Sequence, residues 1–217
     1  MRENRDVIRM LACLVSLWLS SHSLAQDSAV PAAVATAAGE AKIARGLLLE
    51  NEGRVFFAPC RDRSYLNVSD GSPDGEVLRA LHDFGLAPGS NLYVELLAVQ
   101  EGGRLRVQAL NFARTSARCL GEVNNDEQWR ALGLEGQWAA VAGAGVLLLE
   151  QSGRTELRTA YRAIEEGKDE FSIPAELAVL HLRRGLCRLK DGSTLSGWQA
   201  ELKTAAGERL EGCGWER

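Results

Sequence analysis

Hydrophobic and polar residues alternate along much of the chain beyond residue 42, and this period of two predicts β-strands. The clearest run is residues 105–110, Leu-Arg-Val-Gln-Ala-Leu. Apolar or alternating runs at residues 47–49, 54–57, 65–68 and 92–99 predict further short strands. Glycine-containing turns separate several of these runs, as in β-hairpins.

One stretch has a helical period instead. Apolar residues recur at spacings of three and four between Val77 and Phe84. Ser72, followed by a proline, predicts the N-terminus of this helix, and Gly85 predicts its end. Several short strands with one helix midway are typical of a small barrel of the OB type.

A second group of strands is predicted beyond residues 124–126, which form a plausible linker. It contains a hairpin at 146–154 and runs at 158–164, 178–183, 197–203 and 209–213. We therefore expect two domains, at residues 43–123 and 127–217. Residues 26–42 are rich in Ala, Ser, Val and Thr, which predicts a flexible leader or, alternatively, a short alanine-rich helix.

The first residues have the pattern of an export signal. Arginines precede an apolar run at residues 10–19, about ten residues long and too short to span a bilayer. Small residues before the expected cut predict cleavage after Ala25, so residues 1–25 are read as a signal peptide. Cys13 lies early in the apolar run, which argues against a lipoprotein signal. The expected product is periplasmic with no membrane anchor, and the alternative is an uncleaved anchor.

Four cysteines remain after the signal, and an oxidising compartment would let them pair. Sequential pairing would join Cys60 to Cys119 and Cys187 to Cys213, one bridge in each domain; crossed pairing is the alternative. The spacings contain no C-x-x-C, so a metal site is disfavoured. We expect no metal and no cofactor.

Charge and histidine content narrow the function classes. The net charge of −4 gives no basic footprint for nucleic acid. Only His82 and His181 remain after export; His82 lies beside the helical stripe, and His181 alternates with apolar residues, so it should face outward. Nucleophilic catalysis needs a base beside a Ser or Cys, and no such constellation is evident. We expect no catalytic residues and no enzyme.

The first domain resembles the C-terminal OB-fold domain of NlpE, an outer-membrane lipoprotein family. The resemblance rests on residues 56–60 (Phe-Phe-Ala-Pro-Cys), 65–66, the helix around Leu78 and Leu81, residues 92–95, and Cys119. It implies an OB fold, an envelope location and a role in recognition. This sequence contains no C-x-x-C, and we expect neither the copper-binding domain nor the lipid anchor of that family, so copper handling and anchored sensing are not implied.

The second domain resembles a broad family of bacterial envelope proteins with a small β-barrel. The shared frame is residues 129–138, then Cys187, Ser196, and residues 207 and 212–214. Leu189 replaces the family's usual aspartate, and Leu195 with Ser196 replaces its Met-Ser pair. A role tied to that loop is therefore not carried over.

Five residues are candidates for ligand or partner binding: Glu135, Trp138, Lys190, Ser193 and Ser196. The first two belong to the Gly-x-Glu-x-x-Trp frame, where the tryptophan either plugs the core or lines a pocket at the barrel mouth. The other three belong to a polar loop at residues 190–197, where the two serines also fit as turn residues. Braced by a disulfide, this loop could enter another protein's cleft, as small barrel inhibitors of lysozyme do.

We therefore expect an all-β protein with a minor α component, built of two small disulfide-braced β-barrels, OB-like then calycin-like. The expected function is non-enzymatic binding of an envelope protein or small ligand in the periplasm, with envelope-stress surveillance as a candidate setting. The alternative is an inhibitor of a lysozyme-type lytic hydrolase.

Overall fold

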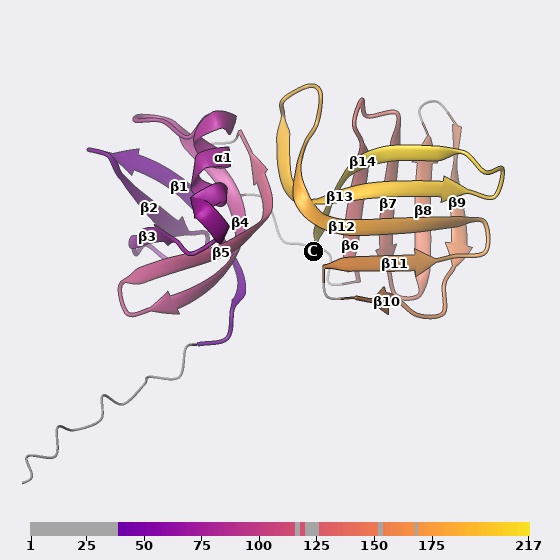
Figure 1. Ribbon diagram of the computed structural model, residues 1–217, viewed down its shortest axis with the longest axis horizontal. Coiled ribbons are helices and arrows are strands. Elements are labelled where there is room, and N and C mark those ends of the chain that lie inside the picture. The colour runs from indigo at the N-terminus through magenta and orange to yellow at the C-terminus, as the bar shows by residue number, and fades with distance from the viewer. Residues whose placement is uncertain (1–38, 116–117, 120–125, 152–153, 168) are drawn as a thin grey trace, which may run out of the picture. The chain divides into compact units, whose positions relative to one another are not determined.

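The structure is a computed structural model that describes residues 39–115, 118–119, 126–151, 154–167 and 169–217. It is mostly β-sheet with one short helix, so the expected fold class is confirmed (Figure 1). The predicted signal peptide, most of the leader and most of the linker lie outside the described residues. No helix within the described ranges is long and apolar enough to cross a membrane.

The first five strands close into a barrel, which we call the first barrel. They are β1 (Lys42–Asn51), β2 (Arg54–Pro59), β3 (Leu66–Asp70), β4 (Asn91–Glu101) and β5 (Arg104–Arg114). The order is β3-β2-β1-β4-β5, and parallel pairing of β3 with β5 closes the ring. Alternate residues point inward to a core that includes Leu48, Phe57, Val94, Leu96 and Val107.

The helix lies between β3 and β4 and begins later than predicted. A short 3₁₀ turn, η1 (Pro73–Gly75), precedes α1 (Glu76–Phe84), so Ser72 is not the N-cap of the α-helix. Its Oγ instead accepts a hydrogen bond from the Val77 N–H at 3.1 Å. Asp70, at the end of β3, accepts from the Leu78 N–H at 2.7 Å. Two residues outside the helix therefore bind its free N–H groups.

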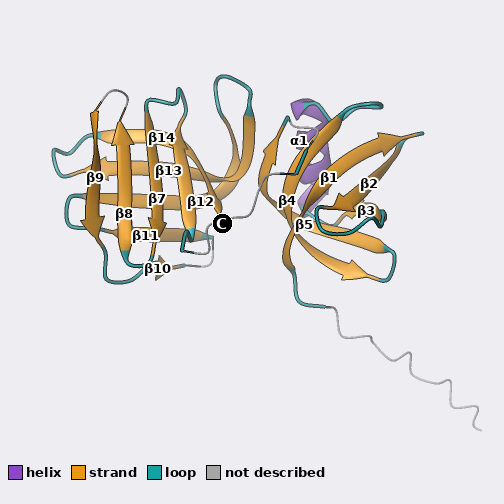
Figure 2. Cartoon of the chain, turned by 180° about the vertical axis from the view of Figure 1, so that it is seen from behind, coloured by secondary structure: helices purple, strands orange, loops and turns teal. Residues whose placement is uncertain are grey.

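The second group of strands forms one curved sheet, which we call the second sheet (Figure 2). Its order is β9-β8-β7-β6-β14-β13-β12-β11-β10, and an isolated bridge connects Tyr161, which follows β9, with Ala175, which follows β11. The strands are β6 (Trp129–Gly133), β7 (Trp138–Gly143), β8 (Val146–Gln151), β9 (Arg154–Ala160), β10 (Glu165–Glu166), β11 (Glu170–Pro174), β12 (Ala178–Arg188), β13 (Thr194–Thr204) and β14 (Arg209–Glu216).

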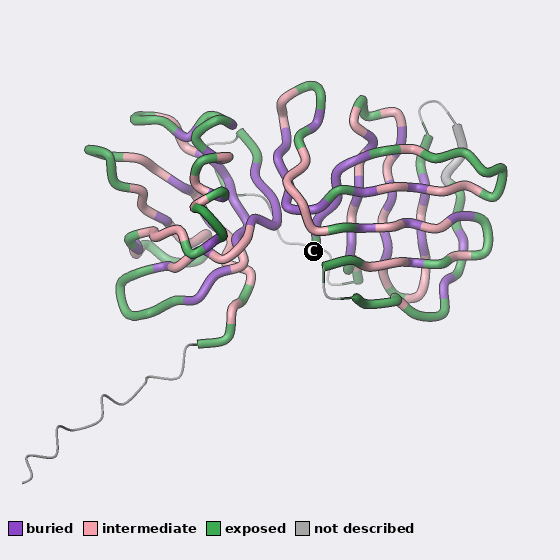
Figure 3. The backbone as a smooth tube through the Cα atoms, viewed as in Figure 1, coloured by how far each residue is buried: buried purple, intermediate pink, exposed green. Residues whose placement is uncertain are grey.

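Buried positions alternate with partly exposed ones along β6, β7 and the first half of β12 (Figure 3). The core of the second sheet is rich in aromatic side chains; Trp129, Phe171 and Trp198 contact one another with ring centroids 4.8 to 5.1 Å apart.

The strand predicted at residues 158–164 is wrong in its second half, because β9 ends at Ala160.

The β12–β13 hairpin joins the second sheet to the first barrel. Residues 194–196 of β13 pair with residues 112–114 of β5, and Leu195 is only 6% exposed within the core of the first barrel. The Asn111 side chain both donates to the Glu216 carbonyl at 2.8 Å and accepts from the Glu216 N–H at 2.9 Å. Phe112 packs on Trp215 with ring centroids 4.8 Å apart.

Both disulfides join the cysteines as predicted. One links Cys60 to Cys119, and the other links Cys187 to Cys213. The second bridge runs between β12 and β14, the two neighbours of β13, and so braces the base of the hairpin that contacts β5.

Candidate functional site: a polar groove on the second sheet

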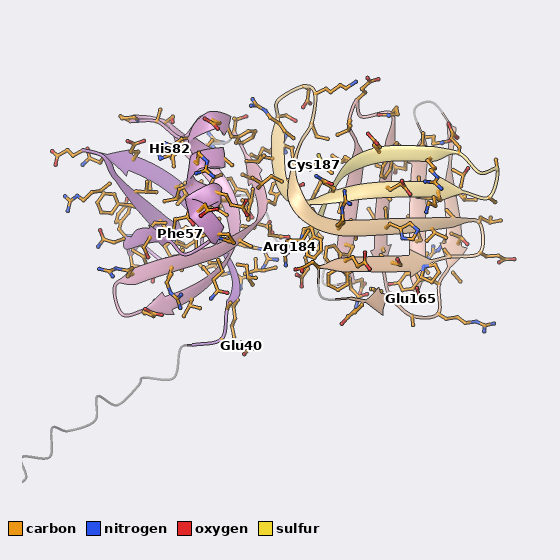
Figure 4. All side chains as sticks on the ribbon, viewed as in Figure 1. Glu40, Phe57, His82, Glu165, Arg184 and Cys187 are labelled. Atoms are coloured by element: carbon orange, nitrogen blue, oxygen red, sulfur yellow. A yellow bond between two sulfur atoms is a disulfide. The ribbon has the colours of Figure 1, made fainter. Side chains whose placement is uncertain are left out.

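Strand β12 has an irregularity where the chain leaves the second sheet toward the first barrel. Its pairing register with β13 shifts between Arg184 and Cys187, the two residues labelled at this point in Figure 4. Beside this irregularity lies a groove of about 630 Å³. Residues of β11, β12, β13 and β14 line it, together with Leu134 from the β6–β7 turn.

Four polar side chains form one row along the groove. Strand register places Ser172 opposite His181, His181 opposite Glu201, and Glu201 opposite Glu211. Because directly paired residues of neighbouring strands share a face, all four side chains lie on the same surface of the sheet. His181 lies between the buried Leu180 and Leu182, so its predicted outward orientation is confirmed.

Hydrogen bonds hold several of these side chains in place. The Ser172 Oγ and His181 Nδ1 atoms are 2.8 Å apart. The next row carries Arg183, whose Nη2 donates to the Gln199 Oε1 at 2.8 Å. Glu201 forms an ion pair with Lys203, with 3.2 Å between Oε1 and Nζ. A ligand in the groove would therefore meet polar groups that are already oriented.

The serine–histidine contact raises the question of nucleophilic catalysis. In a catalytic triad, a carboxylate hydrogen-bonds to the second ring nitrogen and orients the imidazole. Here the neighbouring Glu201 is paired with Lys203, and among the described residues no hydrogen bond joins it to His181. Among the described residues, no cluster of three or more His, Cys, Asp or Glu side chains is arranged to hold a metal ion. The arrangement is suited to hydrogen bonding a ligand.

Two of the predicted site residues meet beside the groove. Lys190 Nζ donates to Glu135 Oε1, and both side chains are largely exposed. This hydrogen bond and the positive charge hold the pKa of Glu135 below its usual range. The Lys190 N–H also donates to the carbonyl of Leu134, a lining residue, at 2.9 Å. The loops of these two residues therefore meet beside the groove.

The sequence allowed Trp138 either to fill the core or to line a pocket at the barrel mouth, and the structure places it in the core. It is 2% exposed and belongs to the core of the second sheet. Its indole ring packs against Gly133 and Gly212, where an added Cβ would lie 2.6 and 2.7 Å from ring atoms. Glu135 and Trp138 therefore do not face a common pocket in the described part of the chain.

The two predicted serines have structural partners. The Ser193 N–H and Oγ both bond to the Asp191 carboxylate at 2.9 Å, and these bonds lower the pKa of Asp191. Ser196 is fully buried, and its Oγ donates to the Trp198 carbonyl at 3.1 Å. The second half of the 190–197 loop is therefore packed within the protein, and Lys190 and Asp191 carry its exposed part.

The groove residues themselves were not predicted. Period-two alternation within β12, β13 and β14 does place His181, Arg183, Gln199, Glu201 and Glu211 on the polar faces of their strands. Which strands are neighbours, and in which register, is not encoded in that local pattern.

Comparisons of this chain with protein-family models, curated proteins and solved structures find no match. The functional argument therefore depends on the geometry of the groove and on the sequence patterns.

Proposed function

We propose that this chain is an exported, non-enzymatic binding protein that holds a short polar segment of an envelope protein, or a small polar ligand, in the groove of the second sheet. The observation that carries the proposal is the groove itself, about 630 Å³ and lined from four strands. Ligand sites typically enclose roughly 300–1,000 Å³. Because the lining residues belong to strands, binding requires little ordering of the protein.

The charges of the groove favour a ligand that carries both signs. Arg183 and Arg188 come from β12, whereas the Glu201 and Glu211 carboxylates lie opposite each other on β13 and β14. Like charges in directly paired positions repel each other. Lys203 already neutralises Glu201, so a ligand cation beside Glu211 and a ligand anion near the guanidinium groups would satisfy both sides. A short peptide segment has this character.

The architecture supports the same class of function. We infer that the first barrel is of the OB type, since five strands with a helix between the third and fourth are typical of it. The resemblance to the NlpE domain implies the same fold, and we infer a calycin-like barrel for the second sheet. Two disulfides are expected of a protein in an oxidising compartment. Envelope-stress surveillance is the setting that the resemblance suggests.

Site-specific cross-linking tests this function. A photo-reactive residue would replace Glu211 in the groove or Arg162, an exposed residue of the connection between β9 and β10 that does not line the groove. With the oxidised chain in its own envelope extract, we expect a discrete adduct from position 211 that Arg183→Glu abolishes. Short zwitterionic peptides should compete with it. Equal labelling from both positions, or an adduct indifferent to Arg183→Glu, would overturn the proposal.

The non-enzymatic part has its own test. We expect no turnover of fluorogenic ester or amide substrates by the oxidised chain. Hydrolysis that disappears in both Ser172→Ala and His181→Ala would contradict this part and would identify the serine–histidine pair as a nucleophilic site.

A further inference from the structure

A second polar surface lies on the outer face of β2, β3 and β5 in the first barrel. Core residues such as Phe57, Leu66 and Leu105 alternate with side chains that point outward. The outward set combines arginine, aromatic and small polar side chains; we call it the arginine–aromatic face, and it consists of Arg54, Phe56, Asn67, Ser69, Arg104 and Arg106.

Strand register brings these residues together. Phe56 pairs with Asn67, which pairs in parallel with Arg104, and Ser69 pairs with Arg106 in the next row. The Arg54 guanidinium carbon lies 5.6 Å from the centre of the Phe56 ring, a cation–π distance. The three strands lie side by side by pairing, and the β2 and β3 ribbons are visible at the outer side of the first barrel (Figure 2).

The connection from β2 to β3 adds two exposed side chains of the same kinds next to these strands. It carries the exposed Arg63 and then Tyr65, which at 65% exposure is the most exposed large apolar or aromatic side chain in the described ranges. Most of the Tyr65 side chain is in contact with solvent, so its ring could pack against a ligand.

Only part of the positive charge of the face is neutralised by carboxylates of the described residues. Arg106 is paired with Glu101 at 3.3 Å. Within the described part of the chain, no carboxylate lies within ion-pair distance of Arg54, Arg63 or Arg104. The chain as a whole has a net charge of −4, so this grouping of arginines is not a consequence of a generally basic composition.

We propose that the arginine–aromatic face binds an anionic oligosaccharide. Guanidinium groups bind carboxylate or sulfate groups through paired hydrogen bonds. The flat rings of Phe56 and Tyr65 can pack on the C–H face of a sugar ring, and Asn67 and Ser69 can exchange hydrogen bonds with its hydroxyl groups. This site is independent of the groove, because it lies on a different set of strands.

Titration calorimetry of the exported, oxidised chain tests the proposal with four probes: an oligogalacturonate, a heparin-derived hexasaccharide, a neutral dextran oligomer and an oligo-dT of similar length. We expect both anionic glycans to bind, more weakly as salt rises, and dextran not to bind. Carboxylate and sulfate sources are distinguished by the first two probes. The variant Arg54→Gln/Arg104→Gln should weaken binding about tenfold or more, as expected for two lost charge-assisted contacts.

Matched variants keep the test specific. Phe56→Ala should weaken glycan binding without changing the net charge. Arg162→Gln/Arg209→Gln, at exposed positions of the β9–β10 connection and of β14, should leave glycan binding unchanged. An equal loss in the control pair would show non-specific charge attraction and overturn the proposal. Absence of binding to either anionic glycan, or tighter binding of oligo-dT than of both glycans, would also overturn it.

Discussion

The carboxylate of Asp70 stabilises the start of α1 although the residue belongs to a strand. One oxygen accepts the Leu78 N–H at 2.7 Å, and the other accepts the Ser72 N–H at 2.9 Å and the Ser72 hydroxyl. A negative charge at a helix N-terminus also interacts favourably with the helix dipole. One side chain therefore fixes the passage from β3 into the helix.

We predict that Asp70→Ala lowers the free energy of unfolding by about 1–2 kcal/mol, as the loss of a helix cap does. Asp83→Ala, an exposed position on the same helix, is the matched control and should change it little. Urea denaturation of both variants followed by circular dichroism measures the difference. Equal stability of the two variants would contradict the capping role.

Glu216 makes folding depend on pH. Its side chain lies at the exposed end of β14, where partial desolvation raises its pKa above the usual 4.5, although Arg184 and Arg45 oppose the shift. The folded state therefore holds the proton more tightly than the unfolded state, so this residue lowers stability as pH rises through the window above 4.5. We predict that Glu216→Gln gains stability relative to the native chain as the pH rises from 4 to 7, a range that includes the usual carboxyl pKa of 4.5. Thermal unfolding across that range checks it, and parallel curves would refute it.

At the scale of elements, the period-two pattern predicted most of the strands of the first barrel because their core positions hold large apolar residues. No strand was predicted for β6 or β7. The buried positions of β7 include Ala140 and Ala142, and alanine is depleted in strands. The helix was predicted, but its start was displaced because Asp70 and Ser72 bind its N–H groups from outside the α-helix.

The close contact between β5 and β13 gives a sharp prediction. A Cβ at Gly197 would lie 1.7 Å from the backbone oxygen of Leu110, and a backbone atom cannot move aside as a flexible side chain can. Gly197→Ala should therefore destabilise the protein by about 3 kcal/mol or more, as severe overpacking does. Gly103→Ala is the control, since a Cβ there would meet nothing within 4 Å. Similar melting temperatures for the two variants would contradict the contact.

At the scale of the whole molecule, the junction should make the first barrel and the second sheet unfold together. Burial of Leu195, the Asn111–Glu216 hydrogen bonds and the Phe112–Trp215 contact all link the two. Trp129, Trp138 and Trp198 lie in the core of the second sheet, whereas Trp215 packs on Phe112 of β5, so tryptophan fluorescence reports mainly on the second sheet and also on the junction.

Removing the Cys60–Cys119 bridge tests this coupling. Loop-closure entropy gives about 4 kcal/mol for a separation of 59 and about 3.5 kcal/mol for the separation of 26 in the other bridge. We predict that replacing Cys60 and Cys119 by serine shifts the tryptophan transition in urea together with the circular dichroism transition. An unchanged tryptophan transition would indicate that the two parts unfold independently.

The sequence by itself determined the β-rich class, the helix and the outward orientation of His181, which follow from local periodicity. It favoured sequential pairing of the four cysteines, and the tertiary structure decided between sequential and crossed pairing. Only the tertiary structure decided that Glu135 meets Lys190, that Trp138 fills the core, and that the groove forms across β11 to β14. The reason is physical: alternation assigns a face to each residue, whereas strand neighbours and register are selected by closing the core as a whole.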